Sequence, residues 1–343
     1  MGARTFRVPG DARGERVDVW LAAQPGAGTR AQIKRAATEG RLRDGRGEAV
    51  RASYRLRGDE TLLLDVVPAS GDDDPQPEDI ALDVLYADDD LVAVNKPPGL
   101  VVHPAAGHPR GTLLNALLHR FPADSPDSAP ARAGIVHRLD RDTSGVILVA
   151  RNVAAHESLA RQFRERSIDK RYLALVRGVV REPGRIELPI GRHPRDRQRM
   201  STAARRARSA RTDYRPLETF AGVATLVEAK PETGRTHQIR VHLAARGWPV
   251  VADATYGKGL REGARLARRA PAHAREAHAA LVTLRRQALH AASIRVRHPK
   301  TEAAMEFEAP LPDDLSRVLE RLRSVCGHGE GSPNPVDSRP GID

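Results

Sequence analysis

A stretch rich in proline, aspartate and small residues divides this chain. Residues 68–79 read PASGDDDPQPED, which has no apolar periodicity and is typical of an exposed linker. The sequence therefore predicts two domains, at 12–67 and at 80–325. The Gly/Pro/Ser-rich segment 326–343 buries too little apolar area to offset its ordering entropy, so we expect it to be disordered.

The domain before the linker is small and basic. RVDVWLAAQP and TRAQIKRAATEG predict two short helices, and Gly40 is placed to end the second one. The alternating segments that follow, with an Asp44-Gly45 turn, predict a small β-hairpin layer. Positive charge gathers on the second helix and just after it, at Lys34, Arg35 and Arg41. From this segment alone, a binding surface and a solvated basic helix explain these charges equally well.

The domain after the linker is richer in strand-like segments than in helical ones. The strand-like segments are LVAVNK, GVILVA, RYLALVRGVV, GVATLVEAK and SIRVRHP. The helical segments are TLLNALLHRF and AAHESLARQFRER. Because strands and helices do not alternate regularly, the pattern predicts an α+β fold around a mixed, mainly antiparallel sheet.

The charge of the chain favours a polyanionic partner. Lys and Arg number 56 against 44 Asp and Glu, a net charge of +12, and the pI is near 10.5. This balance is typical of nucleic-acid-binding proteins. Alanine and arginine are abundant throughout and only 3% of residues are aromatic, which indicates a coding bias, so the position of the charge matters more than its total. Residues 195–211 and the helix-like 260–286 concentrate arginine, either as loops over a polyanion or as solvated insertions.

The chain shows no sign of export. Its one cysteine, Cys326, cannot form an intrachain disulfide, which favours a reducing compartment. MGARTFRVPGD at the amino terminus has no apolar core, and no apolar run approaches the length of a membrane span. We expect a cytoplasmic monomer without a membrane partner.

Motifs for nucleotide and metal binding are missing. No G-x-G-x-x-G follows a strand-like segment, and no G-x-x-x-x-G-K-[ST] occurs. His237 and His242 are spaced as two helix-borne zinc ligands would be, but no glutamate lies between them and no thiolate is nearby. We therefore expect neither a cofactor nor a metal.

Four polar clusters in the second domain are left as candidate sites: NKPPGLVVHP, HRLDRDTSG, KRY and GRTHQIRVH. HRLDRDTSG stands between short apolar runs at 134–136 and 145–150, which predicts strand, loop and strand. Continued alternation would place Arg138 and Asp140 on one face. Taken alone, a local ion-pair cluster explains these charges best, and Asp140-Arg141-Asp142 also has some likeness to the paired aspartates of metal-dependent phosphotransferases.

The wording and order of these clusters resemble a known family. HRLDRDTSG, KRYLALVRG, KPETGRTHQIRVHLA, VADATYG and QALHA closely resemble the RluA family of RNA pseudouridine synthases, over about Arg16 to Leu322. The first domain is similar to the RNA-binding domain named for ribosomal protein S-four. With NKPPGLVVHP included, the chain is most similar to the large-subunit ribosomal RNA synthase D branch. The resemblance implies isomerisation of uridine to pseudouridine in large-subunit (23S) ribosomal RNA or an assembling large subunit, without a cofactor.

The resemblance also implies roles for individual residues. Asp140 would be the catalytic carboxylate, acting on the sugar as nucleophile or as base, and Arg240 would be its ion-pair partner. Tyr172 would stack on the target uracil, although a buried core tyrosine is the plainer interpretation. Arg138 would fill the space left by the flipped base, offsetting part of the few kcal/mol that flipping costs.

Further residues would serve RNA binding. Lys34, Arg35 and Arg41 would contact phosphates, which gives affinity without sequence choice. Arg235, His237 and Gln238 would either contact RNA or brace Asp140, and the sequence leaves this choice open.

The chain departs from the family pattern at one motif. The family often has a Gly-Asp-Pro run where this chain has Ala252-Asp253-Ala254, so local geometry there is expected to differ. A catalytically idle RNA-binding or ribosome-assembly factor is the alternative function. Such a factor has no need for Asp140, Tyr172 and Arg240 together, which argues against it.

Overall fold

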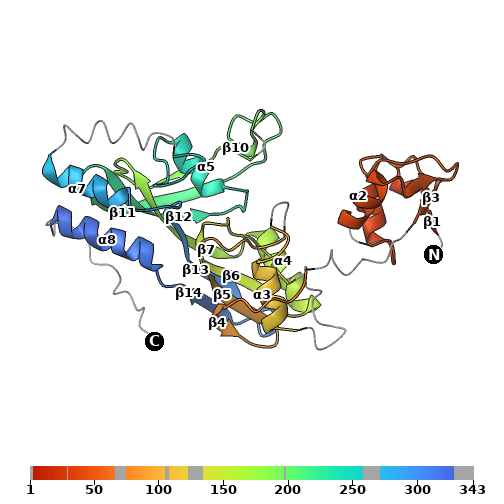
Figure 1. Cartoon of the computed structure of the whole chain (residues 1–343), viewed down its shortest axis with the longest axis horizontal. Helices are drawn as coiled ribbons and strands as arrows, with labels where there is room; N and C mark the ends of the chain where they lie inside the picture. The colour runs from red at the N-terminus through yellow and green to blue at the C-terminus, as the bar shows by residue number, and fades with distance from the viewer. Residues whose placement is uncertain are drawn as a thin grey trace. The chain divides into compact units, whose positions relative to one another are not determined.

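The chain forms two compact units in a computed structural model, Met1–Gln76 and Pro77–Asp343 (Figure 1). The division falls inside the stretch 68–79. The structure describes residues 3–28, 30–65, 75–104, 108–122, 134–196, 198–257 and 271–327. The segment 326–343, expected to be disordered, therefore lies almost wholly outside the described residues, as does most of the linker.

The smaller unit is a three-stranded antiparallel sheet with two helices. Its elements are β1 (Arg4–Arg7), the 3-10 turn η1 (Gly10–Ala12), α1 (Val17–Trp20), η2 (Leu21–Ala23), α2 (Arg30–Thr38), β2 (Leu42–Asp44) and β3 (Thr61–Leu64). The strand order is β1-β3-β2, so β3 is central. Ile33 of α2, Leu42 of β2 and Leu62 of β3 are fully buried in one core. Both predicted helices are present, and the first continues into η2.

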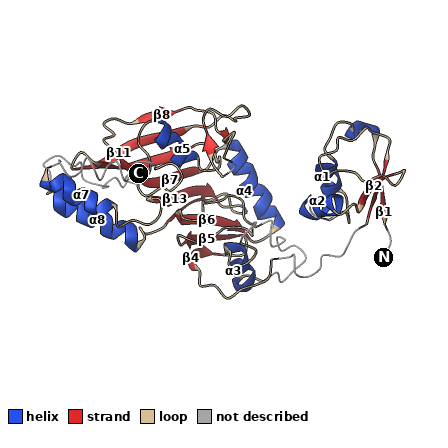
Figure 2. Cartoon of the chain, turned by 45° about the horizontal axis from the view of Figure 1, so that its top comes forward, coloured by secondary structure: helices blue, strands red, loops and turns tan. Residues whose placement is uncertain are grey.

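The larger unit is built on one long sheet. Within the described residues its nine strands are β4 (Asp83–Ala87), β5 (Leu91–Lys96), β6 (Ser144–Ala150), β7 (Asp169–Arg177), β8 (Gly184–Ile186), β11 (Thr212–Phe220), β12 (Ala224–Pro231), β13 (Leu289–Arg297) and β14 (Ala304–Glu308). They follow the order β4-β5-β6-β13-β7-β12-β11-β8, with β14 beside β13 (Figure 2). Only β6 and β13 pair in parallel among these strands. The predicted α+β fold with a mixed, mainly antiparallel sheet is confirmed.

Helices cover this sheet from both sides. They are α3 (Leu113–Arg120), α4 (Val153–Glu165), α5 (Gln238–Ala245), α7 (Ala272–Leu281) and α8 (Asp313–Cys326). The residues of β5 alternate between two clusters: Leu91 and Ala93 pack with α4, whereas Val92 and Val94 pack with α3. Burial on both faces explains why these strands are continuous apolar runs. Helices α7 and α8 lie side by side, and α8 also contacts β11 (Figure 1).

Two predicted details differ in the structure. Residues 134–136 do not form a strand, because only Ile135 makes a bridge, to Val149. Most of this segment has no strand partner and instead delivers the chain into the HRLD loop. GRTHQIRVH contains the start of α5. The sequence suggests a helix here only as a possible carrier of two zinc-binding histidines.

The arginine-rich segments also have defined parts. In 195–211, β10 (Met200–Ser201) pairs with β9 (Gly191–Arg192), and Arg208 bridges to Ile190. We call residues 191–209 the basic arm. In 260–286, residues 258–270 are outside the described chain, and α7 supplies the helix expected there. No helix in the described residues is long and apolar enough to cross a membrane.

Candidate active site

A pocket of about 610 Å³ lies in the larger unit. Its walls come from the HRLD loop, the end of α4, the start of β7 and the turn that leads from β12 into α5. The sequence-predicted residues of this unit all line it: Arg138, Asp140, Tyr172, Arg235, His237, Gln238 and Arg240. Segments about 100 residues apart, such as those of Asp140 and Arg240, are therefore brought together at one site.

A buried lysine fixes one end of the HRLD loop. Lys96, at the end of β5, is fully buried, and its ammonium donates to the carbonyl oxygens of Pro97, Leu100 and Arg141 at 2.8, 2.9 and 2.9 Å. Burial lowers the pKa of Lys96 to about 7. The three carbonyls occupy all three donors of the ammonium, so this lysine joins NKPPG to the loop that carries Asp140.

The chain around the start of β13 fixes the other end of the loop. Three of its side chains reach consecutive loop residues: Arg286 donates to the Asp142 carbonyl at 3.0 Å, Gln287 donates to Thr143 Oγ1 at 3.1 Å, and His290 Nδ1 lies 3.0 Å from Ser144 Oγ. His290 Nε2 lies 3.1 Å from the Ala309 carbonyl and must donate to it, so Nδ1 accepts from the serine hydroxyl. The QALHA motif thus positions the loop through Gln287 and His290, while its Leu289 lines the pocket.

Gly145 ends the loop where the backbone of β13 passes closest. Its φ is +111°, and a Cβ on this residue would lie 2.1 Å from the Ala291 carbonyl oxygen. Only glycine fits this position. The TSG of the motif is therefore explained by packing against β13.

Three charged side chains form a chain of ion pairs behind the pocket. Arg240 Nη1 donates to Asp140 Oδ2 at 2.8 Å, while Nε and Nη2 hold both oxygens of Asp253 at 2.6 and 2.9 Å. The side chains of Arg240 and Asp253 are 6% and 0% exposed, and that of Asp140 is 17% exposed toward the pocket. Arg240 is thus fixed from behind and presents one N–H to Asp140.

Asp253 is a site residue that the sequence reasoning did not identify. Besides holding Arg240, its Oδ1 accepts from the backbone N–H groups of Thr255 and Tyr256 at 2.9 and 3.0 Å. Burial opposes ionisation, but the bonds from Arg240 outweigh it and lower the pKa of Asp253. Ala252 and Ala254 stand where the family that the sequence resembles often has glycine and proline, but the aspartate between them still anchors Arg240.

His237 contacts Asp140 from the other side without forming an ion pair with it. The Tyr256 hydroxyl accepts from Met200 N at 2.8 Å and lies 2.9 Å from His237 Nδ1, which holds the imidazole ring in place. His237 Nε2 lies 3.9 Å from Asp140 Oδ1, too far for a hydrogen bond. Burial lowers the pKa of His237, so the ring is neutral near pH 7.

Tyr172 lies half-buried on β7 and faces the pocket between two core clusters. Burial, and then the charge of Asp140, raise the pKa of its hydroxyl. The hydroxyl therefore stays protonated near pH 7.

Comparison with known proteins gives the family of this site. A model of the RNA pseudouridylate synthase family matches residues 90–245. The ribosomal large subunit pseudouridine synthase D of Xanthomonas campestris is 42% identical over 92% of this chain and 91% of its own. The chain belongs to the RNA pseudouridine synthases.

A further sequence relative and a solved structure support the same family. An RNA pseudouridine synthase of Chloroflexus aurantiacus, described as uncharacterized, is 46% identical to the synthase over 95% of each chain. Among solved structures, human RNA pseudouridylate synthase domain containing 4 matches with a TM-score of 0.53 and 26% identity, over 70% of the synthase and 93% of that chain.

The other predicted site residues of the synthase differ in burial and in the number of hydrogen bonds that they make within the protein. Gln238 is 4% exposed, and its amide bonds to Thr233, to the Arg235 backbone and to the chain at 211–212. These bonds hold the turn between β12 and α5, and none of them reaches Asp140. Arg235 Nε donates to the Ser209 carbonyl of the basic arm at 3.2 Å. Arg138 is exposed and makes no hydrogen bond or ion pair within the described residues.

In the smaller unit the predicted cations also differ. Arg35 Nε and Arg41 Nε both donate to Glu39, at 2.9 and 2.8 Å. Lys34 is exposed, and no partner for it occurs in the described part of the chain. Glu39 therefore neutralises part of the charge that the sequence places on this helix.

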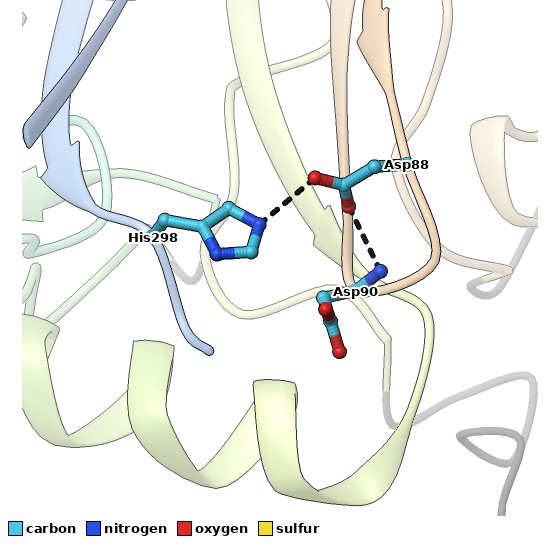
Figure 3. Close-up of side chains that lie close together, drawn as sticks. All are labelled: Asp88, Asp90 and His298. Carbon is cyan, nitrogen blue, oxygen red and sulfur yellow. Dashed lines mark hydrogen bonds and ion pairs between the residues drawn. The ribbon is translucent and has the colours of Figure 1, made fainter. Parts of the chain in front are cut away.

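One cluster of possible metal ligands lies outside the pocket (Figure 3). Asp88, Asp90 and His298 come close at the β4–β5 turn, but both oxygens of Asp88 already accept hydrogen bonds. Oδ1 accepts from the backbone N–H groups of Asp90 and Leu91 at 2.8 and 2.7 Å, and Oδ2 lies 2.8 Å from His298 Nε2. These contacts account for the cluster as a clamp on the turn.

Proposed function

We propose that this synthase converts uridines of large-subunit ribosomal RNA to pseudouridine, with Asp140 as the catalytic carboxylate. The observation that carries the proposal is the state of its two oxygens. Oδ2 is held by Arg240, whereas Oδ1 faces the pocket and accepts no hydrogen bond from the described residues. A fixed carboxylate with one free oxygen is what an attack on the sugar, or removal of a proton from it, requires.

The reaction needs no group beyond those in the pocket. The bond from C1′ to N1 of the uracil breaks, the base turns, a bond from C1′ to C5 forms, and the C5 proton leaves to water. N1 takes up a proton from water in exchange, so the product is an isomer of the substrate and atoms and electrons balance. Arg240 acts as a fixed cation in this scheme, because the bonds from Asp253 overcome the effect of burial and raise its pKa.

Tyr172 serves the detached base in this proposal. Its ring faces the pocket from β7, and its hydroxyl keeps its proton near neutral pH. This supports stacking on the uracil over a role as phenolate base. Arg138, exposed at the mouth and without an internal partner, is available to fill the gap left by the flipped nucleotide.

The ribosomal target rests on relatives and on charge. Proteins named ribosomal large subunit pseudouridine synthase D match most of this chain at 39–44% identity. The basic arm adds exposed arginines that have no internal partner in the described chain: Arg195, Arg205, Arg206 and Arg208. Together with Lys34 of the smaller unit, which we propose to be an RNA-binding domain, they supply phosphate contacts. Because the proposed substrate is ribosomal RNA, we expect this activity in the cytoplasm.

The test is tritium release from transcripts labelled at uridine C5. Wild-type protein is incubated with 23S, 16S and transfer RNA transcripts and with assembling large subunits, without added nucleotide. We expect release from 23S RNA or from the assembling subunit, abolished in Asp140→Asn with RNA binding retained.

The control is Asp213→Asn, which removes an Arg–Asp ion pair with Arg185 outside the pocket and should leave release unchanged. Release by Asp140→Asn at the wild-type rate would show that the carboxylate assignment is wrong. Release from 16S or transfer RNA alone would overturn the ribosomal large-subunit target. No release from any substrate would favour an idle RNA-binding factor.

A further inference from the structure

Lys170 is a pocket residue to which the reaction scheme gives no task. It lies on β7 two residues before Tyr172, so the two side chains share one face of the strand and both line the pocket. Arg171, on the opposite face, is fully engaged with Ser293, Glu306 and Glu308. The ammonium of Lys170, in contrast, makes no hydrogen bond or ion pair within the described residues.

No neighbouring carboxylate in the described chain forms an ion pair with Lys170. Its Nζ lies 5.9 Å from the centre of the Phe163 ring, and the His137 ring stacks on Phe163 at 4.8 Å. His137 Nε2 accepts from Leu148 N at 2.8 Å, and burial lowers the pKa of His137 to about 3, so this ring is neutral. The nearest carboxylate in sequence, that of Asp169, is exposed and lies 3.7 Å from Lys230.

An unpaired ammonium in this setting is unfavourable for folding alone. Burial lowers the pKa of Lys170 to about 8, against the opposing effect of Asp169, so the amine is still mainly charged at pH 7. A methionine of similar length would avoid the desolvation cost at the same place. The charge is therefore better explained by a ligand than by packing.

The neighbouring charges indicate the class of this ligand. Arg164, on the last turn of α4, and Arg138 also line the pocket, and neither has a partner in the described chain. The carboxylates of the lining are engaged, Asp140 with Arg240 and Glu232 with Arg211. Three cations of the lining therefore have no counter-charge in the described chain, which favours an anionic ligand. The anionic group of RNA is its phosphodiester.

We infer that Lys170, assisted by Arg164, binds a backbone phosphate adjacent to the uridine held in this pocket. The spacing fits, because Lys170 and Tyr172 are separated by about 7 Å along the strand, within the reach of one nucleotide. The inference rests on the proposed function, since it takes the pocket to hold a flipped uridine. In this arrangement Tyr172 holds the base and Lys170 holds the backbone beside it.

The test compares Lys170→Met, Lys170→Arg and the control Arg161→Met. Arg161 is exposed on α4, has no partner in the described chain and does not line the pocket, so its loss matches the charge change alone. Single-turnover tritium release and RNA binding are measured from low to high salt, on whichever transcript the wild type modifies. Thermal unfolding is recorded for each variant.

We expect Lys170→Met to lower the single-turnover rate divided by the dissociation constant by about 10- to 100-fold, as for loss of a hydrogen bond to a charged group. The slope of log affinity against log salt should fall by about 0.7, one phosphate contact on a single strand. Lys170→Arg should keep the slope, and the melting temperature of Lys170→Met should not fall.

Three outcomes would overturn the inference. These are an unchanged slope in Lys170→Met, an equal change in Arg161→Met, or a lower melting temperature that accompanies the loss of activity. Each of them leaves the proposed function standing if the wild type still modifies 23S RNA. Wild-type release from another RNA class would instead contradict the ribosomal target and leave the Lys170 comparison intact.

Discussion

The ion-pair chain behind the pocket predicts an unusual order of stability among three variants. Asp140 and Asp253 share the single cation of Arg240, and Asp253 is fully buried. Arg240→Met leaves two carboxylates facing an apolar side chain. Removing one partner of a buried pair costs about 3–5 kcal/mol. At roughly 2–4 °C per kcal/mol for a unit of this size, the melting temperature should fall by roughly 6–20 °C.

The other two variants should be less severe, in a fixed order. Asp253→Asn removes the bidentate partner but leaves Arg240 paired with Asp140, so we expect an intermediate loss of stability. Asp140→Asn keeps both bonds from Arg240 to Asp253 and leaves equal numbers of positive and negative charges. Its melting temperature should therefore stay close to the wild-type value although activity is lost.

The pH dependence gives an independent check of this reasoning. In the wild type the pKa of Asp253 is lowered, so its ion pair stabilises the fold above the ordinary carboxyl pKa near 4, and this stabilisation is lost as the pH falls through the folded value. In Arg240→Met, only the two backbone N–H bonds to Asp253 oppose burial, so its pKa should rise and protonation should relieve the buried charge. The gap in stability between Arg240→Met and wild type should therefore shrink between pH 7 and pH 5.

Scanning calorimetry of the full chain measures these quantities, with the transition of the larger unit as the readout. If Asp140→Asn lost as much stability as Arg240→Met, the shared-cation argument would fail. A gap that stayed constant from pH 7 to pH 5 would equally contradict it, since the loss would then come from packing and not from charge.

Three further predictions concern the supports of the loop and the turn clamp. Lys96→Met leaves three carbonyl oxygens without their donor and should reduce both activity and stability, the latter by about 1–3 kcal/mol or more, measured by urea unfolding. Gly145→Ala places a Cβ against the Ala291 carbonyl and should displace the loop, seen as lost tritium release in folded protein; wild-type activity would contradict this. A chelator should leave the melting temperature unchanged, because the hydrogen bonds of Asp88 to its neighbours, including His298, account for the turn; a fall would indicate a bound metal.

The strands that the sequence predicts well are those whose burial is complete. β5 and β6 appear as unbroken apolar runs because both faces of each are covered, by α3 on one side and α4 on the other. The false strand at 134–136 has the same β-branched composition. What separates it from a true strand is that a single residue finds a partner, which local sequence does not record.

The parts of the site that the sequence could not predict depend on distant partners. In the sequence, Lys96 is one basic residue in a proline-rich turn. Its role in holding the loop becomes evident only in the fold, where its ammonium donates to the Arg141 carbonyl, 45 residues away. Asp253 is equally inconspicuous, since the residues on both sides of it are alanines. Its part follows from the position of Arg240, which α5 places against it. The resemblance assigned the reacting residues, but not the side chains that hold them.

The total charge of the synthase says little about how it meets RNA, and the pairing of each charge says more. Arg240 and Arg286 form ion pairs with carboxylates, and these pairs stabilise the geometry of the site. Arg138, Arg164 and Lys170 have no such partner in the described chain, and all three line the pocket. Arg138 and Arg164 are exposed to solvent, but an unpaired ammonium at the half-buried Lys170 costs free energy in the absence of a ligand, which points to an anion that pairs with it. By this reasoning, the basic residues that bind RNA can be found by replacing each with a neutral residue. Where the ligand-free protein stays as stable as before, or becomes more stable, the charge serves binding and not folding.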